Sequence, residues 1–377
     1  MDTTQMRPAL NIPPGDFVLE AMEARGWTQE NLAEVLGVSA TTVNKLIKAK
    51  QSITVDMAKR LQSAFGQSAQ YWLSLESNYQ LRQSQGGEDL EIGRKSVLFS
   101  HVPVNALRKK GWVSAEASPG EVESWLVRLW ETDDLEVALN KTVDLPMAAR
   151  RSTAYSQFSE YHAAIWFQVA RRLASSVAVP EFAPETLGHL VTQIPEFSTR
   201  LDGIGDFLSE LSGAGVKFLV LSHLPKTYTD GAAFWDDANP VIVITARLNW
   251  CDSFWFTLAH EIGHVLLHLR DHDDFFIDEG VDGVGARESE ANDFARNVLC
   301  HESVLAFFGP RQPRISRSLV ERYAQDMNIS PSLIVGCLHH DGVVPHGNLN
   351  ALRTKVLPLI PNSYLFDERV RDVVCVA

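Results

Sequence analysis

The hydrophobic positions near the start of the chain fall into short runs that are separated by helix-capping residues. Thr28 precedes QENLAEVL, Ser39 precedes ATTVNKLI and Thr54 precedes VDMAKRLQSAF, while Gly37 follows the first of these runs. Ser and Thr side chains accept hydrogen bonds from free backbone N–H groups at helix starts, and Gly enters the left-handed region that ends helices. The pattern predicts short helices with very short loops over about residues 15–79.

The segment TQENLAEVLGVSATTVNKLI has the spacing of two helices that cross steeply through a turn of about three or four residues. Ala33 is small enough for a close approach and Gly37 makes the turn, while three apolar side chains fill the angle between the helices: Val38, Val43 and Leu46. In a DNA-binding domain of this type the second helix, here residues 40–47, enters the major groove.

The polar residues of this segment have the character of a DNA-binding surface. Ala40, Thr41 and Lys45 would face base edges. Residues that would hold phosphates or sugars, and so set the register, are Gln29, Ser39, Thr42 and Asn44. The alternative is a small helical bundle that binds protein rather than DNA.

The same residues carry a resemblance to a known family. Gln29, Ala33, the run Gly37-Val38-Ser39 and Val43 resemble the phage-repressor (XRE-type) helix-turn-helix, and residues 14–81 resemble HigA-type antitoxin and repressor domains. The resemblance implies operator DNA as a partner. It also implies binding as a homodimer, with half-sites about one helical turn, roughly 34–36 Å, apart.

The middle of the chain, about residues 81–200, shows helical periods such as VESWLVRLWE and YHAAIWFQVARRLASS but no catalytic constellation. Aromatic residues at helical spacing normally pack in a core, which is expected of Trp125, Trp130, Trp166 and Phe167. We therefore expect a helical linker that leads into the next domain.

Two runs rich in β-branched residues, 216–224 and 240–248, predict strands, and residues 257–269 (TLAHEIGHVLLHL) predict a largely buried helix. His260 and His264 lie one helical turn apart, about 6 Å along the axis, on the same face of this helix. Two imidazole nitrogens can therefore reach one metal ion.

Glu261 completes an H-E-x-x-H pattern, in which the glutamate acts as the general base. Zinc lowers the pKa of its bound water towards about 7, and the glutamate takes a proton as that water attacks a carbonyl.

A catalytic zinc ion usually has three protein ligands. Residues 286–299 predict a second helix, in which Glu288 falls within the apolar stripe and Glu290 lies to its side. A carboxylate that points into a core needs a partner, so Glu288 is the predicted third ligand and Glu290 is the alternative. Asn292, one turn after Glu288, could orient a histidine ring.

TLAHEIGHVLLH followed by ESEANDFA (288–295) resembles the ImmA/IrrE metallopeptidase family over about residues 215–345. The resemblance implies a gluzincin-like α+β fold and cleavage of repressors of stress or mobile-element genes. It also implies that His260, His264 and Glu288 bind the metal and that Glu261 is the catalytic base. Zinc (Zn2+) is preferred over manganese from the ligand types and from this resemblance.

The remaining polar residues of this region are weaker candidates. His268 and His272 are expected to make surface or capping contacts, with oxyanion stabilisation as the alternative for His268. His339 and His340 are open to the same readings. The acidic run around residues 271–279 predicts a solvated loop, with binding of a basic substrate segment as the alternative.

Length and composition indicate the number of domains, the compartment and the state of the cysteines. A chain of 377 residues, 45% hydrophobic and 21% charged, predicts two or three globular domains. The absence of a long apolar stretch and of a secretory signal predicts a cytoplasmic protein without a membrane partner. The four cysteines lie far apart without a C-x-x-C pair, which predicts free thiols.

Charge is unevenly placed along the chain. Residues 1–75 hold seven Lys/Arg and seven Asp/Glu, so the net charge of −13 lies entirely in the rest. Between Glu34 and Asp56 the only charged residues are Lys45, Lys48 and Lys50. This basic stretch is compatible with DNA binding despite the acidic total.

The sequence as a whole predicts an all-α helix-turn-helix domain (1–80), a helical linker (81–200) and an α+β gluzincin-like metallopeptidase domain (201–377). The predicted function is a transcriptional regulator that cleaves a partner protein, such as a repressor or toxin, or itself. The alternative is a non-catalytic HigA-like antitoxin or repressor whose metal domain is a sensor or protein-binding module.

Overall fold

A computed structural model describes residues 11–83, 87–143, 158–270, 275–278, 285–311 and 315–375. The chain divides into two compact units, an N-terminal unit (Met1–Ser96) and a second unit (Val97–Ala377). This division differs from the predicted ranges 1–80, 81–200 and 201–377, because most of the expected linker packs as part of the second unit. Among the described residues, no helix is both long enough and apolar enough to cross a membrane.

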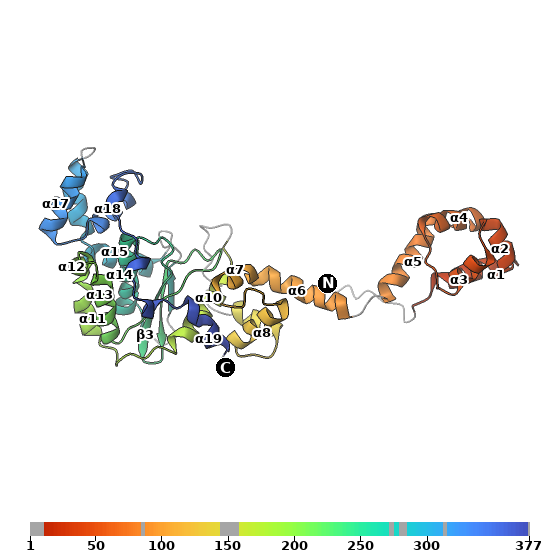
Figure 1. The fold of residues 1–377 in the computed structure, drawn as a ribbon, viewed down its shortest axis with the longest axis horizontal. Helices are drawn as coiled ribbons and strands as arrows, with labels where there is room; N and C mark the ends of the chain where they lie inside the picture. The colour runs from red at the N-terminus through yellow and green to blue at the C-terminus, as the bar shows by residue number, and fades with distance from the viewer. Residues whose placement is uncertain are drawn as a thin grey trace. The chain divides into compact units, whose positions relative to one another are not determined.

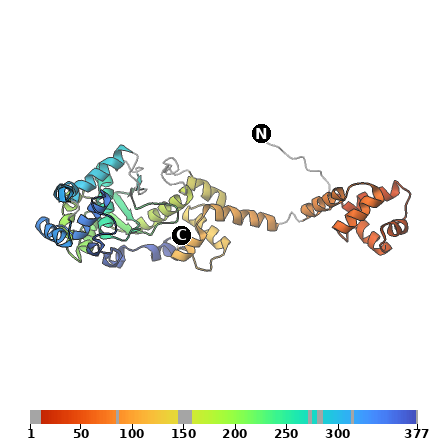
Figure 2. The ribbon, with the colours of Figure 1, turned by 90° about the horizontal axis from the view of Figure 1, so that it is seen from above.

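The N-terminal unit is entirely helical, as predicted, and is drawn in red and orange in Figure 2. Its helices are α1 (Pro14–Glu23), α2 (Gln29–Leu36), α3 (Ala40–Ile47), α4 (Val55–Phe65) and α5 (Ala69–Gln83). The predicted caps are confirmed, since the side chains of Thr28, Ser39 and Thr54 each accept a backbone N–H at the start of α2, α3 and α4.

The turn between α2 and α3 depends on Gly37, which ends α2 with φ of 65° in the left-handed region. Val43 and Leu46 are buried in the angle between the helices, and Ala33 faces them with 6% of its surface exposed. A Cβ atom on Gly15 would overlap the carbonyl groups of Leu46 and Ile47, so glycine is needed where α1 meets the end of α3. The unit is held together by close backbone approaches as well as by its apolar core.

The second unit is built on a four-stranded sheet in the order β1-β3-β2-β4. Its strands are β1 (Lys217–Val220), β2 (Gly231–Asp236), β3 (Asn239–Ile244) and β4 (Phe275–Asp278). β1 pairs with β3 in parallel, and β2 pairs antiparallel with both β3 and β4. The sequence predicted β1 and β3 but not β2 or β4.

Both faces of the sheet are covered by helices. Ile242 and Ile244 of β3 face one apolar cluster, while Val241 and Val243 face another. Successive side chains of a strand point to opposite faces, so the unbroken apolar run of β3 reflects burial on both sides. In Figure 1 the sheet, labelled at β3, lies between α11, α13 and α14 on one side and α8, α10 and α19 on the other.

The first helical layer comes from the region predicted to be a linker. It contains α6 (Gly87–His101), α7 (Val104–Lys110), α8 (Pro119–Leu129), α9 (Leu135–Val143) and α10 (Glu160–Ala174), of which α6 spans the division between the units. The predicted core positions Trp125, Trp130, Trp166 and Phe167 are all buried, and they pack with the Val241 and Val243 face of the sheet. These helices are therefore one wall of the second unit.

The opposite face of the sheet is covered mainly by later helices. They are α11 (Pro184–Val191), α12 (Ile194–Ser198), α13 (Gly203–Gly213), α14 (Cys251–Leu267), α15 (Ala286–Val298), α16 (His301–Phe308), α17 (Arg317–Met327) and α18 (Pro331–His340). Cys300, in the left-handed region with φ of 57°, joins α15 to α16. α14 contacts β2, β3, α15 and α18, so it lies at the centre of this half of the unit.

The last part of the chain returns to the first helical layer. After α18, short 3-10 turns lead to α19 (Val370–Cys375): η3 (Asn350–Leu352), η4 (Leu357–Leu359), η5 (Asn362–Tyr364) and η6 (Asp367–Arg369). Another 3-10 turn, η2 (Gly309–Arg311), follows α16. The Asp367 carboxylate accepts hydrogen bonds from Trp112 Nε1 at 3.0 Å and from Ser222 Oγ at 2.5 Å. This contact ties α19 and the residues after α7 to the end of β1.

We predict that Leu173→Ala, in α10, destabilises the second unit by about 2–5 kcal/mol, because Leu173 is fully buried against the sheet. Urea denaturation of the full chain, followed by tryptophan fluorescence, measures the loss. Val137→Ala is the control, since Val137 is 45% exposed and its truncation should change stability by less than about 0.5 kcal/mol. Equal effects of the two changes would contradict a structural role for this helical layer.

Candidate functional site

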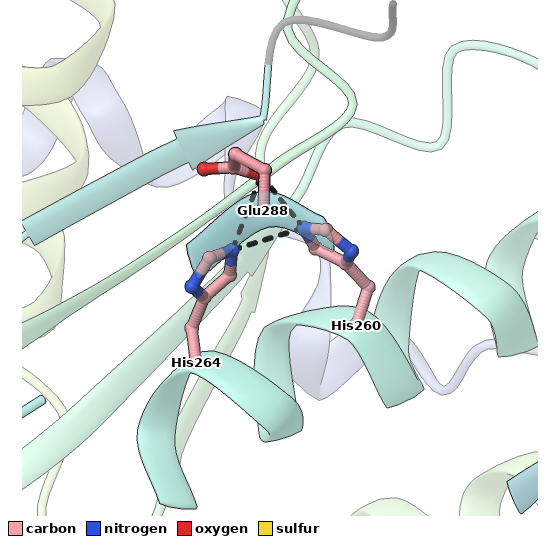
Figure 3. A group of neighbouring side chains, drawn as sticks. All are labelled: His260, His264 and Glu288. Atoms are coloured by element: carbon pink, nitrogen blue, oxygen red, sulfur yellow. Dashed lines mark hydrogen bonds and ion pairs between the residues drawn. The ribbon is translucent and has the colours of Figure 1, made fainter. Parts of the chain in front are cut away.

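Two helices bring His260, His264 and Glu288 together. His260 and His264 lie one turn apart on α14, and Figure 3 shows both rings pointing towards Glu288 of α15. The Nε2 atoms of the histidines are 3.0 Å apart, and Glu288 Oε2 lies 3.3 Å from the first and 3.4 Å from the second. We call these residues the α14–α15 cluster.

The spacing of these atoms fits a zinc ion. Four ligands placed tetrahedrally at about 2.0–2.1 Å from zinc lie about 3.3 Å from one another, close to the separations of 3.0, 3.3 and 3.4 Å found here. Two imidazoles and one carboxylate are also a ligand set of catalytic zinc sites, which keep a fourth position open. The α14–α15 cluster could therefore hold such an ion with little rearrangement.

The second ring nitrogen of each histidine is occupied by a neighbour. His260 Nδ1 lies 3.0 Å from Asn292 Oδ1, and because an amide oxygen only accepts, Nδ1 carries the proton and Nε2 carries the lone pair that could bind a metal. His264 Nδ1 lies 3.0 Å from His268 Nδ1, and His268 Nε2 lies 2.9 Å from Glu290 Oε2. If His268 donates from Nε2 to Glu290, its Nδ1 accepts the proton of His264 Nδ1. Both His260 and His264 then carry the proton on Nδ1, and their Nε2 lone pairs face Glu288.

The electrostatics of the cluster favour the protonation states that bind metal. Burial lowers the pKa of His264 and outweighs the opposing effect of Glu288, so the neutral imidazole is favoured. Burial would raise the pKa of the Glu288 carboxyl, but in the absence of a metal ion a proton on His260 or His264 Nε2 is donated to Glu288, and this hydrogen bond prevails and holds the pKa well below its usual range. The carboxylate is therefore ionised at neutral pH. A metal ion would take the place of the donated proton.

Glu261 is completely buried and lies on the side of α14 that faces β2. A Cβ atom on Gly231 of β2 would come within 3.0 Å of Glu261 Cγ and Cδ, so the glycine provides the space that this side chain occupies. The sequence predicted the role of Glu261 but gave no sign of this strand contact, since β2 was not recognised.

Gly263 gives α15 its close approach to α14. A Cβ atom at this position would lie 3.0 Å from Cδ1 of the Phe294 ring. Phe294 is on the same helix as Glu288, so the packing of this ring against Gly263 helps to fix the position of the carboxylate relative to the two histidines.

Some polar residues differ from their predicted roles. His268 is the C-cap residue of α14, but its side chain is buried between His264 and Glu290 rather than on the surface. Glu290, the alternative third ligand, contacts His268 instead of joining the α14–α15 cluster. The signal available in the sequence was the spacing of His268, one further turn along the same helix as His264. His272 and the acidic side chains of residues 271–279 lie outside the described residues, but the prediction of a loop here is wrong for residues 275–278, whose backbone pairs with β2 as strand β4.

The other histidine pair, His339 and His340, lies at the end of α18 and not in the α14–α15 cluster. His339 is buried, and its Nε2 donates to the carbonyl of Asn348 at 2.8 Å. Both residues line a cavity of about 450 Å³ that also reaches Glu288 and Asn292 on α15. The candidate metal centre therefore opens into a space large enough for part of a ligand.

The predicted DNA-binding residues gather on the start of α2 and on α3. Ser39, Ala40, Thr41 and Lys45 are exposed, while the others are partly buried: Gln29, Thr42 and Asn44. Asn44 Nδ2 donates to Gln29 Oε1 at 3.1 Å, a bond that fixes α3 against α2. Ser39 also caps α3 by accepting from Thr42 N at 3.1 Å, so part of this polar set has a structural role within the unit.

Comparison with known families finds one match within each unit. The family described as "Helix-turn-helix" matches residues 18–72, and the family described as "IrrE N-terminal-like domain" matches residues 214–331. The chain joins a helix-turn-helix domain to an IrrE N-terminal-like domain. The second match includes the whole sheet and α14 and α15, and so holds all residues of the α14–α15 cluster and Glu261.

Relatives of the helix-turn-helix domain are found among curated proteins. Virulence-associated protein I of Dichelobacter nodosus is 33% identical over 75 residues, which is 20% of this chain and 69% of that protein. The uncharacterized HTH-type transcriptional regulator YddM of Escherichia coli (strain K12) is 26% identical over 92 residues, 24% of this chain and 98% of that protein. Both similarities are confined to about a quarter of the chain or less.

Among solved structures, the antitoxin HigA of Pseudomonas aeruginosa with the higBA promoter is 34% identical to this chain. The match covers 22% of this chain and 91% of that one, with a TM-score of 0.21. The curated relative YddM and the family match together show that the N-terminal region is similar in sequence to helix-turn-helix regulators. The IrrE N-terminal-like match follows it in the same chain.

We predict that His268→Ala and Asn292→Ala each weaken zinc binding by about 10–100-fold, because they remove the partners that orient His264 and His260. Competition of the purified chain with a chromophoric chelator measures the affinity. His189→Ala is the control, since His189 is an exposed histidine on α11. Zinc binding as tight as that of the unaltered chain in both variants would contradict the orienting role.

Proposed function

We propose that the chain is a DNA-binding transcriptional regulator whose IrrE N-terminal-like domain is a zinc-dependent endopeptidase. The proposed substrate is a partner protein, such as a repressor or toxin, or the chain itself, and cleavage changes transcription. The observation that supports the enzymatic half most directly is the α14–α15 cluster, with ligand spacings that suit zinc and with Glu261 next to a ligand on the same helix.

The proposed division of labour follows from the chemistry of each side chain. When bound, zinc supplies a Lewis acid that acidifies a water molecule and polarises a peptide carbonyl. His260, His264 and Glu288 would hold it, while Asn292 and His268 keep the two rings in their binding tautomers. Glu261 accepts the proton of the water as general base and passes it to the departing peptide nitrogen.

The burial of Glu261 supports this assignment. Glu261 is adjacent in sequence to His260 and is excluded from bulk water, so a proton that it accepted would not be exchanged directly with solvent. The cavity beside Glu288 gives a substrate segment access to the centre. Much of its lining comes from α14, α15 and α18, so the helices that position the ligands also help to shape the space where substrate would lie.

The DNA-binding half of the proposal rests on the helix-turn-helix match and on α3. Ala40, Thr41 and Lys45 lie exposed along this helix and would read base edges in the major groove. Lys48 and Lys50 follow it without an intervening acid, and so strengthen attraction to phosphates. Two chains in a homodimer would occupy two half-sites of an operator.

We predict that Glu261→Gln binds zinc as the unaltered chain does but loses cleavage by at least about 10²-fold, because the amide cannot accept the proton. Cleavage is measured on the chain itself and on proteins encoded beside its gene, with and without a chelator. Glu185→Gln, an exposed position on α11, is the control and should cleave normally.

The outcomes of this test separate the two candidate functions. Cleavage by Glu261→Gln at the normal rate would reject the general-base role. A zinc-loaded chain that cuts none of these proteins, with its DNA binding intact, would favour the non-catalytic regulator in which the metal domain is a sensor or protein-binding module.

We predict that Lys45→Ala weakens operator binding by about 1–3 kcal/mol, because it removes a base-edge contact from α3. Titration of the promoter of its own gene at several salt concentrations measures the affinity, which should fall steeply as salt rises. Lys109→Ala is matched in charge and lies exposed on α7 of the second unit. Equal losses for the two variants, or no binding by the unaltered chain, would contradict the assignment.

A further inference from the structure

A second group of potential metal ligands lies between α16 and α18. It consists of His301 at the start of α16, Cys337 on α18 and Asp341 at the end of α18, with their ligand atoms all within 4.8 Å of one another. His301 Nε2 and Asp341 Oδ2 are 2.5 Å apart, and Cys337 Sγ lies 3.9 Å from the carbonyl oxygen of His301. We call these residues the α16–α18 cluster.

The fold holds these three side chains in place from two directions. Cys337 and Asp341 are one helical turn apart, so they project from the same side of α18. α16 packs against α18 and delivers His301 to that side. The convergence is therefore a product of helix packing.

The chemistry of the donors suits a zinc-class ion. Thiolate, imidazole and carboxylate are the three side-chain ligand types that zinc takes. One thiolate and one carboxylate would together balance the charge of a divalent cation. A tetrahedral ion requires ligand separations of about 3.3 Å, so His301 and Asp341 must move apart slightly from their present 2.5 Å.

An ion pair beside a buried thiol is the alternative arrangement of the same residues. Burial raises the pKa of the Cys337 thiol to about 12, so in the absence of a cation the sulfur keeps its proton. A coordinated thiol is deprotonated outright, because the metal ion replaces the proton. The two arrangements therefore differ in a measurable property, the ionisation of the Cys337 sulfur.

We propose that His301, Cys337 and Asp341 form a second zinc-class metal site, separate from the α14–α15 cluster. His301 and Cys337 line the cavity of about 450 Å³ that also reaches Glu288, so an ion bound by them would be reached from that cavity. His340 lines the same cavity, with its Nδ1 3.5 Å from Asp341 Oδ1.

The sequence alone did not reveal this cluster. The cysteines were judged by the absence of C-x-x-C pairs, whereas here a single cysteine combines with a histidine that lies 36 residues earlier in the chain. The available signal was the spacing of Cys337 and Asp341, four residues apart in the sequence.

Cobalt substitution of the full chain tests the proposal directly. A thiolate bound to Co2+ gives a charge-transfer absorption in the near ultraviolet, and the α14–α15 cluster contains no sulfur that could produce it. We expect the unaltered chain to show this absorption and Cys337→Ser to lose it together with one bound cobalt ion. Cys300→Ser and Cys251→Ser are matched controls that should keep both.

Two further variants test whether the thiolate absorption depends on the α14–α15 cluster, and whether its loss could reflect misfolding. His264→Ala should lose cobalt from the α14–α15 cluster and keep the thiolate absorption. Asp341→Asn leaves the thiol in place and should weaken the sulfur-bound ion by at least about tenfold, with circular dichroism confirming that the variant is folded. Absence of thiolate absorption in the unaltered chain at saturating cobalt, or its persistence in Cys337→Ser, would overturn the proposal.

Discussion

The burial of α14 is the constraint on which the candidate site depends. His260, Glu261 and His264 have 2%, 0% and 0% of their surface exposed, and a buried polar group is costly unless it has a partner. The partners of the two imidazoles come from α15 and from the end of α14 itself. The helix can therefore remain in the core only if Glu288 and Asn292 lie against it, so the stability of the fold and the geometry of the site have a common cause.

Much of this arrangement could be predicted from local sequence patterns. The caps at Thr28 and Ser39 and the buried face of α14 depend on neighbouring residues, so periodicity and capping chemistry were sufficient to find the helices. Strand β2 was missed because GAAFWD has small residues in place of β-branched ones, and β4 was missed because it lies within the acidic run, whose charge predicted a solvated loop. The spacing of His268 places it on the same face of α14 as His264, but its contact with Glu290 and the space beside Gly231 arise from tertiary packing, which spacing along the chain does not encode.

The expected linker shows the same limit at the level of a domain. The helical period of this region correctly predicted that Trp125 and Trp166 are buried. The period does not specify which surface a helix packs against. The partner is the second face of the sheet, whose strands come later in the chain. The IrrE N-terminal-like match begins at residue 214 and leaves this layer out, so the unit that folds is larger than the region that the family defines.

The junction at Cys300 gives the two ligand clusters a mechanical connection. Only Leu299 and Cys300 separate α15, which carries Glu288, from α16, which begins with His301. The left-handed backbone at Cys300 makes a tight turn between the two helices. A tilt of α16 is thus transmitted to α15 through almost no intervening chain. Suppose that both clusters bind cations and that a cation in one cluster changes the affinity of the other cluster by some factor. Thermodynamic coupling is reciprocal, so a cation in the second cluster then changes the affinity of the first by the same factor.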